Sequence, residues 1–151
     1  MKRANFNITV EIPAPRPLVW SVISDIERWP EWTPSISWVK KLSSGPLHVG
    51  SRALVCQPKL PLAYWRVTDF NPGVRFTWVS VALVVRVTAR HEVQGNSSGC
   101  LVTLAIDYEG LFGALLTRWI DNLNNRYLSM EATGLKSRCT ELSAKSFVGI
   151  P

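Results

Sequence analysis

The chain has 151 residues, a formal net charge of +6, seven tryptophans and three cysteines. This length predicts a single domain over residues 1–151 that can bury a sizeable core without disulfides or structural metal ions. The longest wholly apolar run, residues 81–85, is too short to cross a bilayer, and no five basic residues stand in a row, so we expect a cytoplasmic protein with no membrane span and a generally basic surface in place of a nucleic-acid site.

The first part of the chain is expected to form one strand and two short helices. Apolar and polar residues alternate over residues 5–12, which is typical of a half-buried β-strand. Prolines at positions 13, 15 and 17 end this strand, and the apolar segment 18–23 then forms a short helix, because proline is tolerated in a first helical turn. Ser24-Asp25 is the expected N-cap of a second short helix over residues 26–31.

Six further strands are expected, separated by turn residues such as the tripeptide Asn71-Pro72-Gly73. They cover residues 36–42, 51–57, 62–70, 74–80, 81–94 and 100–109. Turn residues are missing between segments 74–80 and 81–94, where a tight bend is expected near residues 80–82. Consecutive strands with short connections favour an antiparallel meander.

Residues 111–142 predict one long helix. The segment contains no proline, and its apolar residues recur mostly at steps of three or four, which draws one stripe along an α-helix. The polar residues between them, Asn124 included, are expected to face water. Because so long an amphipathic helix needs a broad apolar partner, we expect an α+β fold in which a curled seven-stranded antiparallel sheet wraps this helix, with the two short helices between the first and second strands.

Several short sequences resemble a known superfamily when they are taken together. In chain order they are Ile12-Pro13-Ala14-Pro15, Val19-Trp20, Ser24-Asp25, Trp29-Pro30-Glu31-Trp32, Gly50-Ser51-Arg52, Gln57-Pro58-Lys59-Leu60-Pro61, Trp65-Arg66-Val67, Pro72-Gly73, Phe76-Thr77-Trp78, His91 and Glu131-Ala132-x-Gly134-Leu135-Lys136. The chain resembles the SRPBCC superfamily, specifically its bacterial polyketide-cyclase/dehydrase-like branch, over about residues 4–140.

This resemblance implies a helix-grip fold, like that of START domains and the birch-pollen allergen, with a deep apolar cavity between the sheet and the C-terminal helix. Members of the superfamily include lipid carriers, hormone binders, aromatases and cyclases, so the fold alone does not decide the function. One departure concerns the bend between the fourth and fifth strands of the six, where relatives often carry a glycine and this chain has Ser80-Val81-Ala82-Leu83.

A few residues are candidates for chemistry or ligand contact. Strand alternation places Leu83, Val85 and His91 on one mostly apolar face, where the imidazole would either contact a ligand or be a core histidine satisfied by a neighbour. His91 and Tyr127 are the candidate catalytic residues. The expected ligand-binding residues are Trp32, Gln57, Trp65, Trp78, His91, Leu116, Trp119, Ile120, Leu123 and Tyr127.

The sequence leaves three functions open. The favoured one is binding of a small hydrophobic ligand (a lipid, polyketide or aromatic compound) in the cavity, because the inner faces carry few polar residues. The alternatives are a polyketide cyclase or dehydratase acting on a ligand in the same cavity, and a protein- or RNA-interaction module. No nucleophile, phosphate-binding or metalloprotease motif is present, and the cysteines and histidines lack ligand spacing, so we expect no metal and no cofactor, in a monomer or homodimer.

Overall fold

The computed structural model of the chain describes residues 2–110 and 114–148. Within them, seven strands form one antiparallel sheet in the spatial order β1-β7-β6-β5-β4-β3-β2. The strands are β1 (Lys2–Ile12), β2 (Trp38–Lys41), β3 (Arg52–Cys56), β4 (Ala63–Asn71), β5 (Arg75–Ala82), β6 (Val85–Asn96) and β7 (Gly99–Gly110). From β2 to β7 each strand pairs with the next one in the chain, so the predicted antiparallel meander is confirmed.

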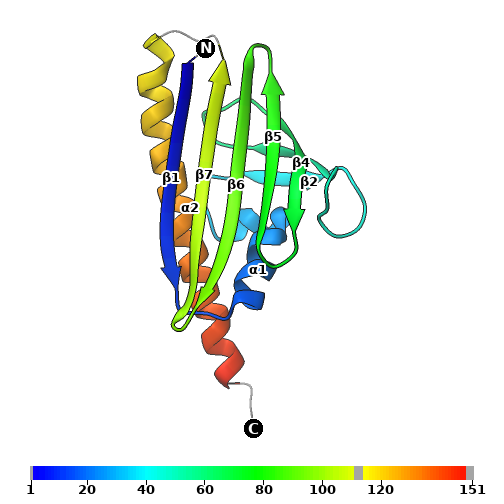
Figure 1. Ribbon diagram of the computed structural model, residues 1–151, viewed down its shortest axis with the longest axis vertical. Helices are drawn as coiled ribbons and strands as arrows, with labels where there is room; N and C mark the ends of the chain where they lie inside the picture. Colours follow the sequence, from blue (N-terminus) through cyan, green and yellow to red (C-terminus); the bar gives the residue numbers. More distant parts are fainter. Residues whose placement is uncertain (1, 111–113, 149–151) are drawn as a thin grey trace.

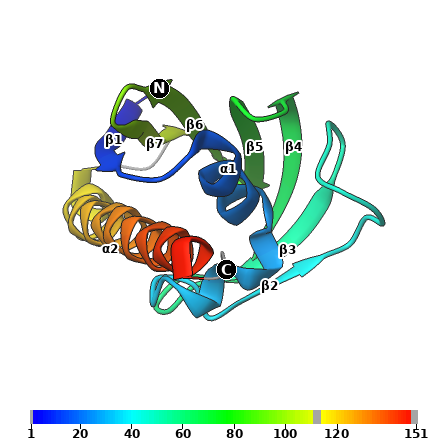
Figure 2. The ribbon, with the colours of Figure 1, turned by 90° about the horizontal axis from the view of Figure 1, so that it is seen from below.

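Helices cover the concave side of the sheet. The short helices α1 (Arg16–Ser24) and η1 (Ile26–Glu31) separate β1 from β2, and the long helix α2 (Ala114–Val148) follows β7. Figure 1 shows α2 beside β1, and in Figure 2 the sheet curls into an arc with α2 across its open side and α1 inside it. Asp25 is the N-cap residue of η1, as predicted, although its side chain makes no capping hydrogen bond. The predicted helix-grip architecture is confirmed.

Alternating burial along the strands builds the core on the inner face. In β4, Trp65 and Val67 are buried whereas Arg66 is exposed, as the sequence predicts. In β5 the buried residues alternate in the same way, and Phe76 is fully buried. This alternation aims the aromatic side chains of the central strands into the arc, toward α1, η1 and α2.

The β5–β6 turn differs from the prediction. Ala82 pairs with Val85, so the two-residue turn consists of Leu83 and Val84, one step later than expected. Leu83 has a φ of 53° and is 94% exposed. Leu83 therefore does not face the helix: a hairpin turn requires a left-handed residue, and leucine takes that place where glycine or asparagine is usual. The inner-face alternation resumes only after the turn and leads to His91.

The closest approach between α2 and η1 occurs at Gly134. A Cβ atom at this position would lie 1.9 Å from the carbonyl oxygen of Trp32, the residue that caps η1. Such a distance is impossible for any residue with a side chain, so glycine is what allows η1 to rest directly on the helix. The helix extends beyond its predicted end at Leu142, and residues 111–113 at its predicted start lie outside the described residues.

Candidate ligand-binding cavity

A cavity of about 50 Å³ lies between the inner face of the sheet and α2. Its lining comprises Trp29, Ile36, Val55, Gln57, Trp65, Trp78, Ala89, Arg90, His91, Leu104, Ala105, Ile106, Asn124, Tyr127, Leu128 and Glu131. Water needs at least about 10–15 Å³ of such volume, so the cavity has room for about three or four water molecules. Among the described residues, the space is therefore much smaller than the deep apolar cavity that the resemblance implies.

Aromatic side chains account for the small volume. Trp65 and Trp78 stack with their ring centroids 5.1 Å apart and their planes inclined by 30°, and Trp29 meets Trp78 edge-on at 5.3 Å. These three rings occupy the interior between β4, β5 and η1, where Trp65 and Trp78 were expected to line a larger space. Trp65 and Trp78 do line the cavity, although they also stack on each other.

His91 lies at the centre of this aromatic cluster. Its ring stacks on Phe76 at a centroid distance of 4.3 Å with an interplanar angle of 12°, and the side chain is only 6% exposed. Burial lowers the pKa of His91 from 6.5 to about 4, although the backbone of Phe76 partly opposes the shift. The imidazole is therefore neutral near pH 7, and its Nδ1 atom finds no hydrogen-bond partner among the described residues.

Asn124 was expected on the wet face of the helix, and that expectation is wrong. The side chain is 5% exposed and lines the cavity, where its Oδ1 accepts a hydrogen bond of 2.9 Å from the hydroxyl of Tyr108. Burial raises the pKa of Tyr108 to about 12, although this hydrogen bond partly opposes the shift. Asn124 lies three residues before Tyr127 and four residues before Leu128, and both of these residues are buried. All three positions therefore share the inward face of the helix.

Glu131 is an acidic cavity residue that was not among the predicted site residues. It follows Tyr127 by one helical turn, and Ser35 Oγ donates a hydrogen bond of 3.2 Å to its Oε1. Burial raises the pKa of this carboxyl to about 7 from its ordinary 4.5, and the Ser35 hydrogen bond partly opposes the shift. The side chain as a whole keeps intermediate exposure, while the carboxyl end reaches the cavity. A glutamate four residues after a stripe tyrosine was the signal that could have identified it.

Two hydrogen bonds tie the connection between β3 and β4 to its neighbours in the fold. The Tyr127 hydroxyl donates a hydrogen bond to the carbonyl oxygen of Pro58, and Gln57 Nε2 donates one of 3.3 Å to the carbonyl oxygen of Ser35. Both side chains line the cavity, as the sequence analysis expected of ligand-binding residues. Because its proton is donated to Pro58, the Tyr127 hydroxyl is less suited to a catalytic role than a free hydroxyl would be.

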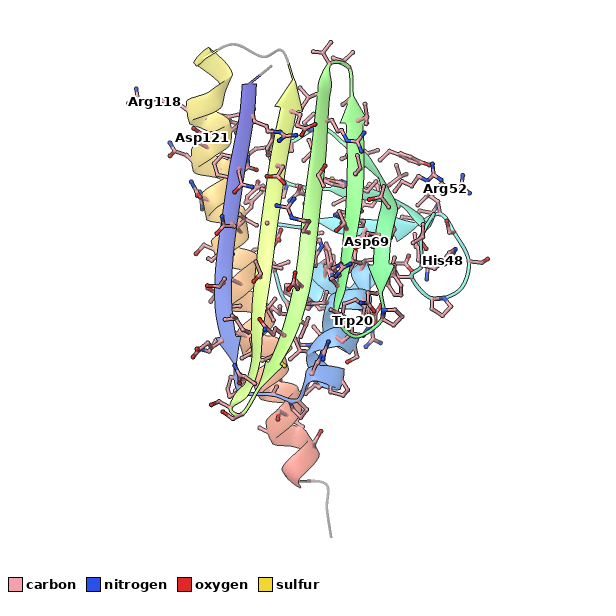
Figure 3. The ribbon with its side chains drawn as sticks, in the orientation of Figure 1. Trp20, His48, Arg52, Asp69, Arg118 and Asp121 are labelled. Carbon is pink, nitrogen blue, oxygen red and sulfur yellow. The ribbon has the colours of Figure 1, made fainter. Side chains whose placement is uncertain are left out.

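The remaining predicted residues lie elsewhere. Trp32 borders an open surface groove between η1 and α2, and Ile120 and Leu123 are absent from the cavity lining. Trp119 is 48% exposed, between Arg118 and Asp121, whose side chains project away from the sheet in Figure 3. A solvated helical face explains this exposure. Leu116 belongs to α2, but its side chain is outside the described residues.

Two further properties of the described chain bear on the class of site. Over residues 2–110 and 114–148, no three histidine, cysteine, aspartate or glutamate side chains gather as metal ligands would. Within the same residues, no helix combines the length and the apolar character that crossing a membrane requires. The cavity lining combines aromatic and aliphatic side chains with the imidazole of His91, two amides, the carboxyl of Glu131 and Arg90.

A curled antiparallel sheet closed by a C-terminal helix, with its cavity between them, is the architecture of START-like ligand-binding domains. Residues 3–140 match the family described as "Polyketide cyclase / dehydrase and lipid transport", and the chain belongs to this family. The SRPBCC resemblance found in the sequence is thereby confirmed. The chain matches no curated protein sequence at a significant level.

Solved structures of low sequence identity share the fold. A START superfamily protein from Mycobacterium smegmatis is 16% identical with a TM-score of 0.72, over 93% of this chain and 98% of that one. Ara h 8.0201 is 9% identical with a TM-score of 0.72, over 93% and 99% of the two chains. The hypothetical protein jhp0584 from Helicobacter pylori is 13% identical with a TM-score of 0.76, over 91% and 88%. At these identities the likeness concerns the fold alone.

Proposed function

We propose that the protein binds a small hydrophobic molecule between the inner face of the sheet and α2. The observation that carries the proposal is an interior cavity lined by aromatic rings, together with buried polar atoms on the lining residues that have no hydrogen-bond partner within residues 2–110 and 114–148. A solid core rarely contains such atoms, because each one costs about 1–3 kcal/mol when it is left without a partner. Family membership supports the same function.

A ligand of ordinary size requires the cavity to widen, and we propose that it widens on the side where α2 faces β3 and β4. The backbone of α2 packs mainly on β1 and α1 and has much less contact with the far strands β3 and β4. Near that side, the Tyr127 hydroxyl reaches the carbonyl oxygen of Pro58 in the connection between β3 and β4. Loss of one such hydrogen bond costs about 0.5–1.5 kcal/mol, so we propose that ligands enter between α2 and this connection.

The proposal is tested by filling the cavity from one strand. Ala89 of β6 is buried and lines the cavity, whereas its neighbour Thr88 points to the other face of the sheet. Titration with the neutral fluorophore 1-aminoanthracene should show saturable energy transfer from tryptophan in the wild-type protein and in Thr88→Leu. Binding should weaken at least about tenfold in Ala89→Leu, because the added side chain occupies the cavity. Equal binding by all three proteins, or no saturable binding, would refute the proposal.

A second function, catalysis of the polyketide cyclase or dehydratase type, has support from one observation. Glu131 and His91 line the same cavity, and near pH 7 one is a partly protonated carboxyl while the other is a neutral imidazole. Such a pair is suited to donate and accept a proton on a confined carbonyl substrate. In this proposal Glu131 replaces Tyr127 as the partner of His91, because the Tyr127 hydroxyl already donates a hydrogen bond to the carbonyl oxygen of Pro58.

The catalytic proposal predicts a loss of turnover in isosteric variants. With a poly-β-ketothioester as substrate, Glu131→Gln and His91→Asn should each lower kcat by about 10²–10⁴-fold, the usual contribution of general acid–base catalysis. Glu141→Gln, on the exposed part of α2, serves as the control. If both cavity variants cyclise or dehydrate the substrate as fast as the wild-type protein does, the cavity holds ligands without catalysing this chemistry.

A further inference from the structure

Three nitrogen atoms around the cavity have no hydrogen-bond partner among the described residues: Trp65 Nε1, Asn124 Nδ2 and His91 Nδ1. They belong to side chains that are 7%, 5% and 6% exposed, and all three residues line the same cavity. They come from three different elements, β4, α2 and β6. One small cavity is therefore lined by three residues that each carry a buried nitrogen without a hydrogen-bond partner among the described residues.

The chemistry of two of these atoms is fixed. The indole nitrogen of Trp65 can only donate a hydrogen bond. The amide of Asn124 uses its oxygen to accept from Tyr108, which leaves the Nδ2 group as a donor. His91 can supply either a donor or an acceptor at Nδ1, depending on its tautomer. The unmet requirement of the cavity is consequently for a hydrogen-bond acceptor.

The surroundings of these donors also limit the charge of the acceptor. Arg90, the cationic residue of the lining, is half-exposed and its guanidinium is bound to Asp107 on the opposite face of the sheet. Glu131 brings a carboxyl to the same cavity. Because no cation faces the donors among the described lining residues and an acid lies nearby, a neutral acceptor fits better than a carboxylate.

We propose that the ligand is a flat ring compound with a neutral carbonyl oxygen, which accepts hydrogen bonds from Trp65 Nε1 and Asn124 Nδ2 while its ring packs among the other aromatic side chains of the lining. Trp29 and Trp78 supply this aromatic surface. This inference rests on the proposed function and narrows it. A hydrocarbon would leave both donors without an acceptor, and a fatty acid would bring a negative charge that the lining does not neutralise.

The test uses two small probes of one shape, 1-indanone and indane, which differ in the carbonyl oxygen. Uniformly ¹⁵N-labelled protein gives separate indole N–H resonances for its tryptophans, and the Trp65 signal is the one missing from the spectrum of Trp65→Phe. Trp38→Phe is the matched control, because Trp38 is 42% exposed on the outer face of β2.

With 1-indanone, the Trp65 indole proton should move downfield on saturation, and the infrared carbonyl stretch of the bound probe should lie at lower wavenumber than in an apolar solvent such as hexane. With indane, the proton should not move downfield. We expect 1-indanone to bind about tenfold more tightly than indane, since two donors each contribute a modest net hydrogen bond. This preference should shrink about threefold or more in Trp65→Phe and in Asn124→Leu, and persist in Trp38→Phe.

The possible outcomes distinguish a failure of the carbonyl inference from a failure of the proposed function. Equal affinity for both probes, with no downfield movement of the Trp65 proton, would overturn the carbonyl inference and leave hydrophobic binding in place. A carbonyl stretch of the bound probe at the position it has in an apolar solvent would overturn it as well. Absence of saturable binding by either probe would overturn the proposed function together with the inference drawn from it.

Discussion

The two ends of the curled sheet differ in how completely their apolar side chains are covered. At the end near α1 and η1, Phe76, Ile23 and Trp29 are at most 4% exposed. At the opposite end, where Figure 1 shows the β5–β6 hairpin and the start of α2, Leu83 is 94% exposed and Trp119 48%. The cavity is lined by residues of both α2 and the central strands. We therefore expect the buried side chains near α1 and η1 to contribute most of the stability of the fold, and the exposed side chains near the β5–β6 hairpin to contribute little.

The largest difference between the ends should appear on truncation of an apolar side chain. Phe76→Ala removes a fully buried ring that stacks on His91 and meets Trp29 and Trp78. We expect a loss of about 3–5 kcal/mol in the free energy of unfolding, measured by urea denaturation. Leu83→Ala at the exposed end should change it by less than about 0.5 kcal/mol. Similar losses for both variants would abolish the distinction between the ends.

The contact between α2 and η1 should not tolerate a side chain at position 134. Gly134→Ala places a Cβ atom 1.9 Å from the carbonyl oxygen of Trp32, so backbone must move. We expect a loss of about 3 kcal/mol in the free energy of unfolding, as for other overpacked sites. Thr133→Ala, on the exposed side of the same turn, is the control and should have little effect. A loss below about 1 kcal/mol would mean that η1 can move away from the helix freely.

Burial of Glu131 predicts a pH-dependent stability. Its pKa of about 7 exceeds the ordinary 4.5, so the folded protein keeps this proton between pH 4.5 and 7 while the unfolded chain releases it. The contribution of Glu131 to the stability therefore falls as pH rises through this window. Glu131→Gln removes the loss, and we expect this variant to exceed the wild-type protein by about 2–3 kcal/mol at pH 8 and by nothing near pH 4.

Urea denaturation at pH 4, 6 and 8 measures this difference. The exposed Glu141, which pairs with Lys145 at 3.0 Å, provides the control, since Glu141→Gln should show no gain at pH 8. A constant difference between wild-type protein and Glu131→Gln at all three values would show that the carboxyl titrates as it does in water.

His91 should give a slope of the opposite sign. Its pKa of about 4 lies below the ordinary 6.5, so between these values the unfolded chain binds a proton that the folded protein does not. This contribution to stability is present above pH 6.5 and is lost as pH falls toward 4. His91→Asn should lack the slope and leave stability falling with rising pH, as Glu131 alone dictates. A parallel pH profile in wild-type protein and variant would contradict the burial of the imidazole.

The smallest expected effect is a gain at the exposed end. Leu83 has a φ of 53°, which strains a residue with a side chain, so Leu83→Gly should stabilise the protein by about 0.5–1 kcal/mol. Val84→Gly is the control, because Val84 is not among the residues with positive φ and glycine there should stabilise nothing. Thermal denaturation of the three proteins measures both differences, and a loss of stability in Leu83→Gly would show that its side chain has a partner.

Most of the fold could be predicted because its signals are periodic. The alternation in β4 was confirmed. Along α2 the stripe residues Leu123, Tyr127, Leu135 and Cys139 are buried as predicted, whereas Trp119 is exposed. The β5–β6 turn was placed one step too early because Leu83 and Val84 carry no turn signal. The strained left-handed conformation of Leu83 is a property of the folded hairpin, and the residue type alone does not predict it.

The candidate site was predicted less well, for two physical reasons. A strict stripe at steps of three and four is narrower than the inward face of a packed helix, so Asn124 and Glu131 were left out while the exposed Trp119 was included. The volume of the cavity depends on how Trp29, Trp65 and Trp78 pack against one another, which spacing along the chain does not determine.

The most direct test of the account locates a bound apolar molecule by intermolecular nuclear Overhauser effects. With saturating 1-aminoanthracene, the account predicts contacts to methyl groups of the cavity lining, in particular Val55, Leu104 and Leu128. Contacts confined to Leu83 and Val84 at the exposed hairpin would contradict it, because the molecule would then be bound outside the protein's interior.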